Sequence, residues 1–451
     1  MVGIAAVDTD TGLTPSLARA LIRGLVRGTA ISSGVRYIHV GHTNWLAAQR
    51  ELLDEIAADG HADTKFVRGT YGAGKSHFLS MVQDLAGVRN WATSHIECKV
   101  DGVQIDRFET LYPQIVGKLR LADMPSGEPD APNDPIRWML EKWAREELRR
   151  AGVREDALTR PFDAELRLYG QLEKRLLRSS LPQDFIRAAA GFARASLARD
   201  AETMAAVCGW ISGTKEWISI PGRYLRQPSA IEPAGKPINL RPIGKGSARD
   251  AMRGVLWLVR SAGYAGLVLC IDEIEELAKL GSKKRQDQAL QTLREYVDHA
   301  GGEGGFRNLC MYLAATPEMF ESEEYFPRYD ALATRIQAVS TEVNWRGPVI
   351  DLDRTPLDGS LMREMAARIC KVYAVAYGAQ IAQQALSKET ISQLVDRVNE
   401  ARFRIAKPRL LARVVVDSLE RIRQGKSAKQ TPDARELVTA AASIIAKELG
   451  A

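Results

Sequence analysis

Eight residues of the chain have the types and the spacing of a phosphate-binding loop. Gly69, Gly74, Lys75 and Ser76 fit the pattern G-x-x-x-x-G-K-[ST]. A glycine-rich loop can turn backbone N–H groups toward a triphosphate, the lysine can reach its β- and γ-phosphates, and the serine hydroxyl can bind Mg²⁺. The alternative is a glycine-rich turn that is followed by Lys-Ser by chance. We therefore expect ATP or GTP to bind here with Mg²⁺.

The expected nucleotide contacts cover the loop and one residue beyond it. Residues 65–67 can form a short strand before the loop, and residues 77–82 can open an amphipathic helix. The N-terminal partial charge of such a helix favours an anion. We assign the nucleotide contacts to Gly69, Thr70, Tyr71, Gly72, Ala73, Gly74, Lys75, Ser76 and His77.

A pair of acids stands at the end of a second apolar run, residues 266–271. Such a run suits a central parallel strand, and ligands bind at the carboxyl ends of strands in an open α/β sheet. We expect Asp272 to hold Mg²⁺ together with Ser76, and Glu273 to polarise the attacking water as general base. The alternative is that the two acids merely cap a following helix.

Three further polar residues are candidates for a catalytic role. Thr316 ends the apolar run 309–315, where its side chain would contact the γ-phosphate or the water. Arg335 has the placement of an arginine finger, a residue that reaches the nucleotide of a neighbouring subunit, so we expect a homo-oligomer. A surface salt bridge is the alternative for this arginine. Arg409 follows Pro408 at a predicted helix start and can face back toward the nucleotide.

The elements that position these residues predict an α/β fold. Roughly 200 residues separate Lys75 from Asp272, more than a β-α-β crossover requires, and residues 136–213 are helical in pattern throughout. From residue 356 on, four helices and no strand are expected. We predict an N-terminal lead-in with the first half of a P-loop core with a parallel sheet, a helical insertion, the second half of the core, and a helical lid, over residues 1–124, 125–245, 246–354 and 355–451.

Composition limits the class of protein. The five cysteines lie far apart without metal-ligand spacing, which predicts a reduced protein without a disulfide framework. The chain has no signal-peptide pattern at its start and no run of eighteen apolar residues, so we expect a cytoplasmic protein without a membrane partner.

The net charge of +6 is concentrated in the last quarter of the chain. Between Arg397 and Lys429, ten basic residues face three acidic ones, Glu400, Asp417 and Glu420. This pattern predicts contact with the phosphate backbone of duplex DNA, and a solvated helical surface is the alternative. Phe403 is the one aromatic residue of this stretch, which argues against stacking on single-stranded bases.

The order of these motifs resembles that of AAA+ ATPases of the initiator, or origin-recognition, type. The stretches RALIRGLVRG, KFVRGTYGAGKSHFL, DRFE, LVLCIDEIEEL and YDALATRI are more narrowly similar to the BrxD-type ATP-binding proteins of bacterial BREX phage-defence loci. In AAA+ proteins the lead-in packs over adenine, for which Val40 and Gly41 are candidates, with a plain packing turn as the alternative. Thr316, Arg335 and Arg409 are similar in position to sensor 1, arginine finger and sensor 2.

The resemblance implies an ATPase that assembles on or near duplex DNA in phage defence and loads or regulates a partner such as a helicase. A rival hypothesis is a switch or scaffold that binds nucleotide without hydrolysing it and recruits partner proteins without touching DNA. The chain departs from initiator proteins in lacking a strand-containing tail for a winged helix, which puts direct base readout in doubt.

Overall fold

The structure is a computed structural model that describes residues 12–27, 34–98, 104–124, 134–153, 161–177, 179–214, 220–225, 240–298, 305–336, 342–378, 387–400, 407–425 and 434–448. By its contacts the chain divides into two units. The first comprises Met1–Leu52, Lys65–Leu85 and Tyr312–Ala451. The second comprises Leu53–Thr64 and Ala86–Met311.

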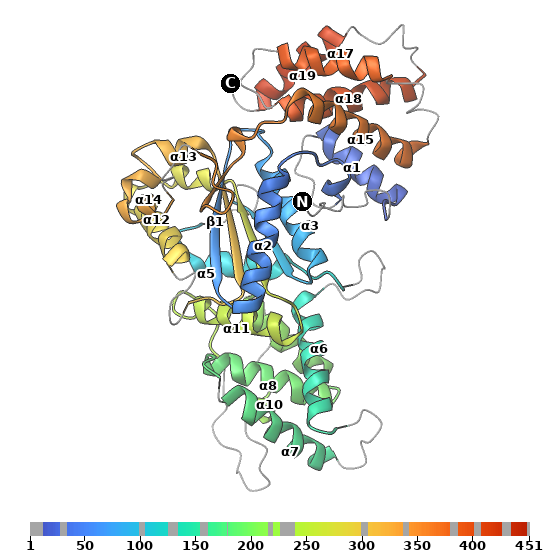
Figure 1. Ribbon diagram of the computed structural model, residues 1–451. Coiled ribbons are helices and arrows are strands. Elements are labelled where there is room, and N and C mark those ends of the chain that lie inside the picture. Colours follow the sequence, from blue (N-terminus) through green and yellow to red (C-terminus); the bar gives the residue numbers. More distant parts are fainter. Residues whose placement is uncertain are drawn as a thin grey trace. The chain divides into compact units, whose positions relative to one another are not determined.

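A six-stranded, mostly parallel sheet forms the centre of the α/β fold (Figure 1). Its strands are β1 (Ala62–Arg68), β2 (Ala92–Glu97), β3 (Leu119–Arg120), β4 (Leu267–Asp272), β5 (Leu309–Ala315) and β6 (Val349–Asp351). The strand order is β3-β2-β4-β5-β1-β6. β1 and β6 are parallel, as are β2 and β4, whereas the short β3 is antiparallel to β2. The mixed α/β class predicted from the sequence is confirmed.

Burial along the strands follows their composition. Every residue of β4 and of β5 is buried, as expected for apolar strands in the middle of a sheet. β4 pairs with β2 from Ala92 opposite Leu267 to Glu97 opposite Asp272, so both strands end on an acidic residue.

The last strand is shorter than the sequence predicted. The sequence predicts the last strand of the core over residues 343–352, but residues 343–348 are not in a strand. Asn344 causes part of this difference, because its backbone oxygen accepts the N–H of Gly347 at 3.0 Å and its Oδ1 accepts the N–H of Arg346 at 3.1 Å. Side chains of this type favour turns by bonding to the nearby backbone. Pro348 follows and has no N–H to donate to a neighbouring strand.

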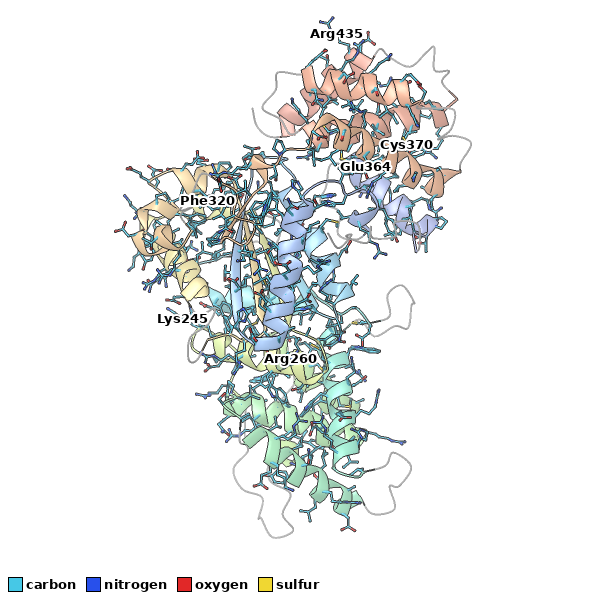
Figure 2. All side chains as sticks on the ribbon, viewed as in Figure 1. Lys245, Arg260, Phe320, Glu364, Cys370 and Arg435 are labelled. Carbon is cyan, nitrogen blue, oxygen red and sulfur yellow. The ribbon has the colours of Figure 1, made fainter. Side chains whose placement is uncertain are left out.

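An aromatic cluster packs the short helix α13 (Pro317–Glu321) onto β1. The rings of Phe66 and Phe326 lie 5.6 Å apart by their centroids, and those of Phe320 and Phe326 lie 5.0 Å apart, both edge to face. Phe320 is labelled in Figure 2. Edge-to-face packing is the favoured arrangement of aromatic pairs, and it fixes the segment that follows β5 against the strand that leads into the glycine-rich loop.

The second unit contains the segment that the sequence predicts to be a helical insertion, residues 125–245. Its described residues between 134 and 225 contain no strand. Asp134 caps the first of these helices, since its Oδ1 accepts the N–H groups of Ile136 and Arg137, and Pro135 takes the first helical position. The helices of this unit outside the central sheet are α5 (Phe108–Gly117), α6 (Pro135–Arg150), α7 (Pro161–Leu172), α8 (Gln183–Leu197), α9 (Ala201–Ile211), α10 (Gly222–Leu225), α11 (Ala248–Ser261) and α12 (Lys283–Asp298).

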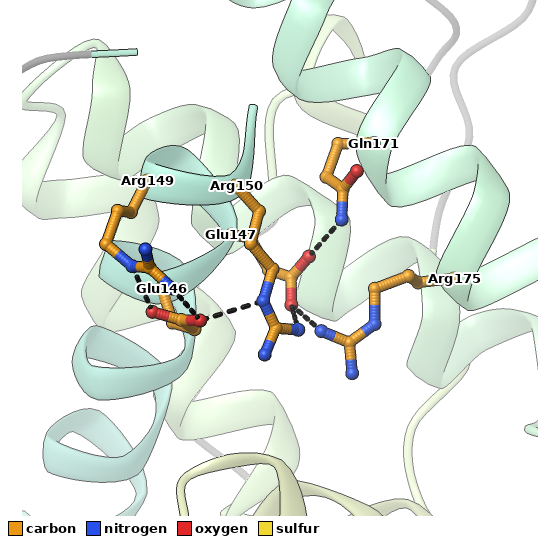
Figure 3. A network of polar contacts seen from close by, with 6 residues as sticks. All are labelled: Glu146, Glu147, Arg149, Arg150, Gln171 and Arg175. Atoms are coloured by element: carbon orange, nitrogen blue, oxygen red, sulfur yellow. Dashed lines mark hydrogen bonds and ion pairs between the residues drawn. The ribbon is translucent and has the colours of Figure 1, made fainter. Parts of the chain in front are cut away.

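A buried carboxylate ties three elements of the insertion together (Figure 3). Glu147 of α6 has a side chain that is 1% exposed, and it accepts from Gln171 of α7 at 3.3 Å and from Arg150 at 3.3 Å. Arg175, in the π-helical segment η2 (Glu173–Leu177) that continues α7, completes the group. A buried charge needs such partners, so the network stabilises the insertion.

The first unit contains the segment that the sequence predicts to be a helical lid, residues 355–451. Four helices are present in its described residues, as the sequence predicted: α15 (Gly359–Tyr377), α17 (Lys388–Glu400), α18 (Lys407–Arg423) and α19 (Ala434–Glu448). They share one core with α1 (Pro15–Arg27), from the other end of the chain (Figure 1). Ala18, Leu21 and Ile22 line the apolar face of α1 in this core. The sequence predicted α1 as a helix but did not predict that it packs with the lid.

No helix in the described parts of the chain combines the length and the apolar character needed to cross a membrane.

Candidate nucleotide-binding site

The glycine-rich loop joins β1 to α3 (Lys75–Val88) and takes up backbone conformations that need glycine. Gly72 and Gly74 have φ values of 76° and 102°, in a region that L side chains rarely adopt. Lys75 begins α3 and Ser76 follows it in the first turn, where a helix leaves N–H groups without intrahelical partners. The loop and the helix therefore have the local structure of an anion site, as the sequence predicted.

Lys75 folds back over the loop. Its side-chain Nζ donates to the backbone oxygen of Gly69 at 2.9 Å and lies 5.4 Å from the centre of the Tyr71 ring. Lys75 is 8% exposed, whereas Tyr71 is 54% exposed. A phosphate oxygen is a charged acceptor and makes a stronger hydrogen bond with an ammonium group than a carbonyl does. The residues present therefore fit a triphosphate.

The base of the loop is anchored by residues far away in the sequence. The N–H of Thr70 donates to Asp353 Oδ2 at 2.9 Å, and its Oγ1 donates to Asp353 Oδ1 at 3.0 Å. Asp353 lies in the 3₁₀ segment η5 (Leu352–Arg354), and its own N–H donates to Asp351 Oδ1. Asp351 Oδ2 accepts from Arg68, the residue before the loop, at 2.8 Å.

Sequence reasoning missed Asp351 and Asp353 as loop partners. A signal was present, since the acids follow the apolar pair Val349–Ile350 just as Asp272 and Glu273 follow an apolar run. The predicted strand 343–352 includes Asp351, which concealed the position of this residue at a strand end.

Thr316 comes after the strand whose last residue contacts the loop. It directly follows β5, is 5% exposed, and precedes α13. Its neighbour Ala315 accepts a hydrogen bond from the N–H of Gly69 at 3.4 Å. Arg335 is exposed in the last turn of the short helix α14 (Asp330–Ile336), and Arg409 is half-buried in the first turn of α18. The roles given to these three residues stay predictions.

The acidic pair ends β4 in the second unit. Asp272 is its last residue and is 2% exposed, and its Oδ1 accepts the N–H of Glu273 at 2.8 Å. Glu273 has left-handed backbone angles, φ 57° and ψ 46°, which cost a non-glycine residue about 1–2 kcal/mol. Such strain concentrates at functional sites. The segment η3 (Ile274–Lys279) follows, but Glu273 makes no side-chain capping bond to it, so capping does not explain this acid.

The chain matches a known protein family whose description fits a nucleotide-binding loop. Residues 13–436 match the model of the family described as BREX system ATP-binding protein BrxC/D. The chain belongs to this family. No curated protein and no solved structure matches the chain. The match confirms the resemblance to BrxD-type proteins and identifies ATP as the nucleotide of this BREX ATP-binding protein.

One residue of the loop helix in this BREX protein forms a pair with a histidine from earlier in the chain. His77, the third residue of α3, hydrogen-bonds through Nε2 to Nδ1 of His39 at 2.9 Å, and the two rings stack with centroids 5.1 Å apart. Burial lowers the pKa of His77 to about 4 and lowers that of His39 well below its usual value. His42 lies close by, with a ring centroid 6.2 Å from that of His39 and Nδ1 3.3 Å from Thr355 Oγ1.

The basic residues of the lid are less available than the sequence suggested. Arg421 pairs with Asp417 at 2.8 Å and Arg423 with Glu420 at 2.8 Å, each within α18. Arg423 also lies over the ring of Tyr377 at 4.6 Å. Four of the ten basic residues fall outside the described residues: Arg402, Arg404, Lys426 and Lys429. Two of the expected phosphate contacts are thus already engaged by acids.

Proposed function

We propose that this BREX ATP-binding protein hydrolyses ATP with Mg²⁺ on an AAA+-type core. The observation that carries the proposal is the strand order, in which β5 lies between β4 and β1. The acidic pair, Thr316 and the glycine-rich loop therefore follow three consecutive strands of one sheet. Ligands bind at the carboxyl ends of strands in open α/β sheets, and each of the three groups stands at such an end.

Each group has a defined task in this proposal. Lys75 and the N–H groups of the loop bind the β- and γ-phosphates. The Ser76 hydroxyl and the Asp272 carboxylate are hard oxygen donors, which suit Mg²⁺, and the ion would neutralise charge on the phosphates. Glu273 orients the attacking water and takes its proton, while Thr316 holds the water or the γ-phosphate.

Single-turnover phosphate release tests the hydrolysis. Glu273→Gln should retain nucleotide affinity and lose about 10²- to 10⁴-fold in rate, because it removes the general base. Lys75→Ala should lose affinity. Glu276→Gln is the matched control, since Glu276 lies three residues further on and pairs with Lys279 instead. Equal phosphate release from wild type and Glu273→Gln would reject the enzymatic claim and favour the rival hypothesis of a non-hydrolysing switch.

We further propose that Arg335 completes the site of a neighbouring copy of the chain. Its exposure on α14 supports this, because a residue that serves another subunit must reach out of its own. Sedimentation with a non-hydrolysable ATP analogue should show self-association of wild type and a monomer for Arg335→Ala. A wild-type monomer at saturating analogue would contradict the proposal.

Contact of the lid with duplex DNA, in support of a partner such as a helicase, is also proposed. Engagement of about three or four phosphates by the lid would give a log–log salt slope of roughly −3 to −4. A binding titration across salt concentrations, with Arg413→Glu beside the wild type, measures this slope. An unchanged slope and affinity in the variant would mean that Arg413 is only part of a solvated surface.

A further inference from the structure

The histidine pair joins the loop helix to the lid. The ring of His39 contacts His77 of α3 through Nδ1 and the backbone oxygen of Gly41 through Nε2, at 3.0 Å. The backbone oxygen of His39 accepts from Arg368 Nη1 of α15 at 2.7 Å. Arg368 is held in turn by Glu364, labelled in Figure 2, at 2.6 Å. The orientation of the His39 ring is therefore fixed from two sides.

These contacts determine which ring nitrogens carry protons. A backbone oxygen can only accept, so Nε2 of His39 must carry a hydrogen. A neutral imidazole carries only one, which makes Nδ1 of His39 an acceptor. The donor in the bond between the rings is then Nε2 of His77. Burial keeps both rings neutral near pH 7, because it lowers both pKa values.

One nitrogen is left as an acceptor. With its hydrogen on Nε2, His77 has a bare lone pair on Nδ1, and the described residues offer this nitrogen no hydrogen-bond donor. His77 directly follows Ser76 in the first turn of α3 and its side chain is only half-buried. A neutral acceptor with a fixed tautomer thus lies one residue beyond the phosphate-binding motif.

We propose that Nδ1 of His77 accepts a hydrogen bond from the nucleoside part of the bound nucleotide. This inference rests on the proposed binding of ATP by the loop and names a residue that determines which nucleoside is preferred. Adenosine offers two kinds of donor, the ribose hydroxyls and the exocyclic amino group. Guanine and hypoxanthine carry an oxygen acceptor where adenine has its amino group, and two facing acceptors repel each other. His39 acts as a positioning residue, because it sets the tautomer of His77.

Analogues of ATP test the bond and distinguish the two donors. Equilibrium dissociation constants are measured for ATP, 2′-deoxy-ATP, 3′-deoxy-ATP and ITP. Loss of the donated group should weaken binding to the wild type about 3- to 10-fold, the usual effect of one net hydrogen bond. Weak binding of ITP alone identifies the amino group as the donor, and weak binding of one deoxynucleotide identifies that hydroxyl.

Two variants of His77 then separate its two nitrogens. Gln at this position can still donate to His39 but lacks an acceptor in place of Nδ1, so His77→Gln should bind the discriminated analogue and ATP equally well. Asn places an oxygen acceptor near the position of Nδ1, so His77→Asn should restore part of the preference. His61→Gln is the control, since His61 lies before β1, outside the loop and α3.

The possible failures are distinguishable. If the wild type binds all four nucleotides equally, the inference is overturned while ATP binding stands, and no variant is needed to reach that conclusion. A His77→Gln protein that keeps the full wild-type preference also overturns it. If Lys75→Ala binds ATP as well as the wild type does, the proposed function itself fails.

Discussion

The two hydrogen bonds between Thr70 and Asp353 should contribute to nucleotide affinity although neither residue need touch the nucleotide. They hold the base of the loop at 2.9 and 3.0 Å. Bonds to a charged acceptor contribute about 1.5–3 kcal/mol when shielded, but both residues are exposed, so about 0.5–1 kcal/mol of this should remain. That energy keeps the loop in its binding conformation. Thr70→Val and Asp353→Ala should therefore each raise the Kd of ATP about 2- to 5-fold.

A double-mutant cycle measures whether the two residues act together. Since a chain of two units need not unfold in one step, the cycle is best measured on nucleotide affinity, by displacement of a fluorescent ATP analogue. The double variant should bind about as weakly as Asp353→Ala alone, because the second change removes a bond already lost. Asp330→Ala, a change of an acid at the start of α14, is the control. A double variant whose loss is the product of the single losses would refute the reasoning.

Three further predictions follow from the packing. Gly41→Ala should destabilise the first unit by about 1–3 kcal/mol, because φ is 75° and the new Cβ would lie 2.5 Å from Leu357. Gly425→Ala is the control, since it has a φ of 79° but open space around the new Cβ. Comparing the two variants in urea unfolding separates backbone strain from the steric clash. The stability of the fold should fall as the pH drops below about 6.5, because burial lowers the folded-state pKa of His39 and the unfolded chain therefore takes up the proton first. His39→Gln should flatten this pH dependence in thermal melts at pH 5 to 7.5. An equally steep profile for the variant would contradict the prediction. Arg285→Ala should lower the midpoint of thermal unfolding, because it leaves the buried carboxylate of Asp106 without its two bonds at 3.0 and 3.2 Å. Replacement of the exposed Arg107 by Ala should change this midpoint little.

The sequence was most informative where the signal is local. The glycine-rich loop, the apolar strands β4 and β5 and the helices of the lid depend on residues that are neighbours along the chain, so pattern and composition predicted them to within a few residues. Asp272 and Thr316 stand at the ends of strands, as predicted, because a polar residue at the end of an apolar run marks a strand end.

The errors have different physical causes. The packing of α1 with the lid depends on pairing the two ends of the chain, which periodicity does not encode. The early turn at Asn344 shortened β6 because local side-chain bonds to the backbone prevailed over strand propensity. The predicted basic surface counted Asp417 and Glu420 but not their pairing with the arginines four and three residues further along the same helix. Counting charges without helical spacing overestimates the free charge of a surface.

The glycine-rich loop is held in place by residues outside its own sequence motif. Its pattern spans eight consecutive residues, yet three contacts that fix its place come from elsewhere: Ala315 on Gly69, Asp353 on Thr70 and His39 on His77. Two of these partners belong to segments that adjoin the lid, since Asp353 precedes α15 and His39 bonds to Arg368 within it. A movement of the lid would therefore be transmitted to both ends of the loop.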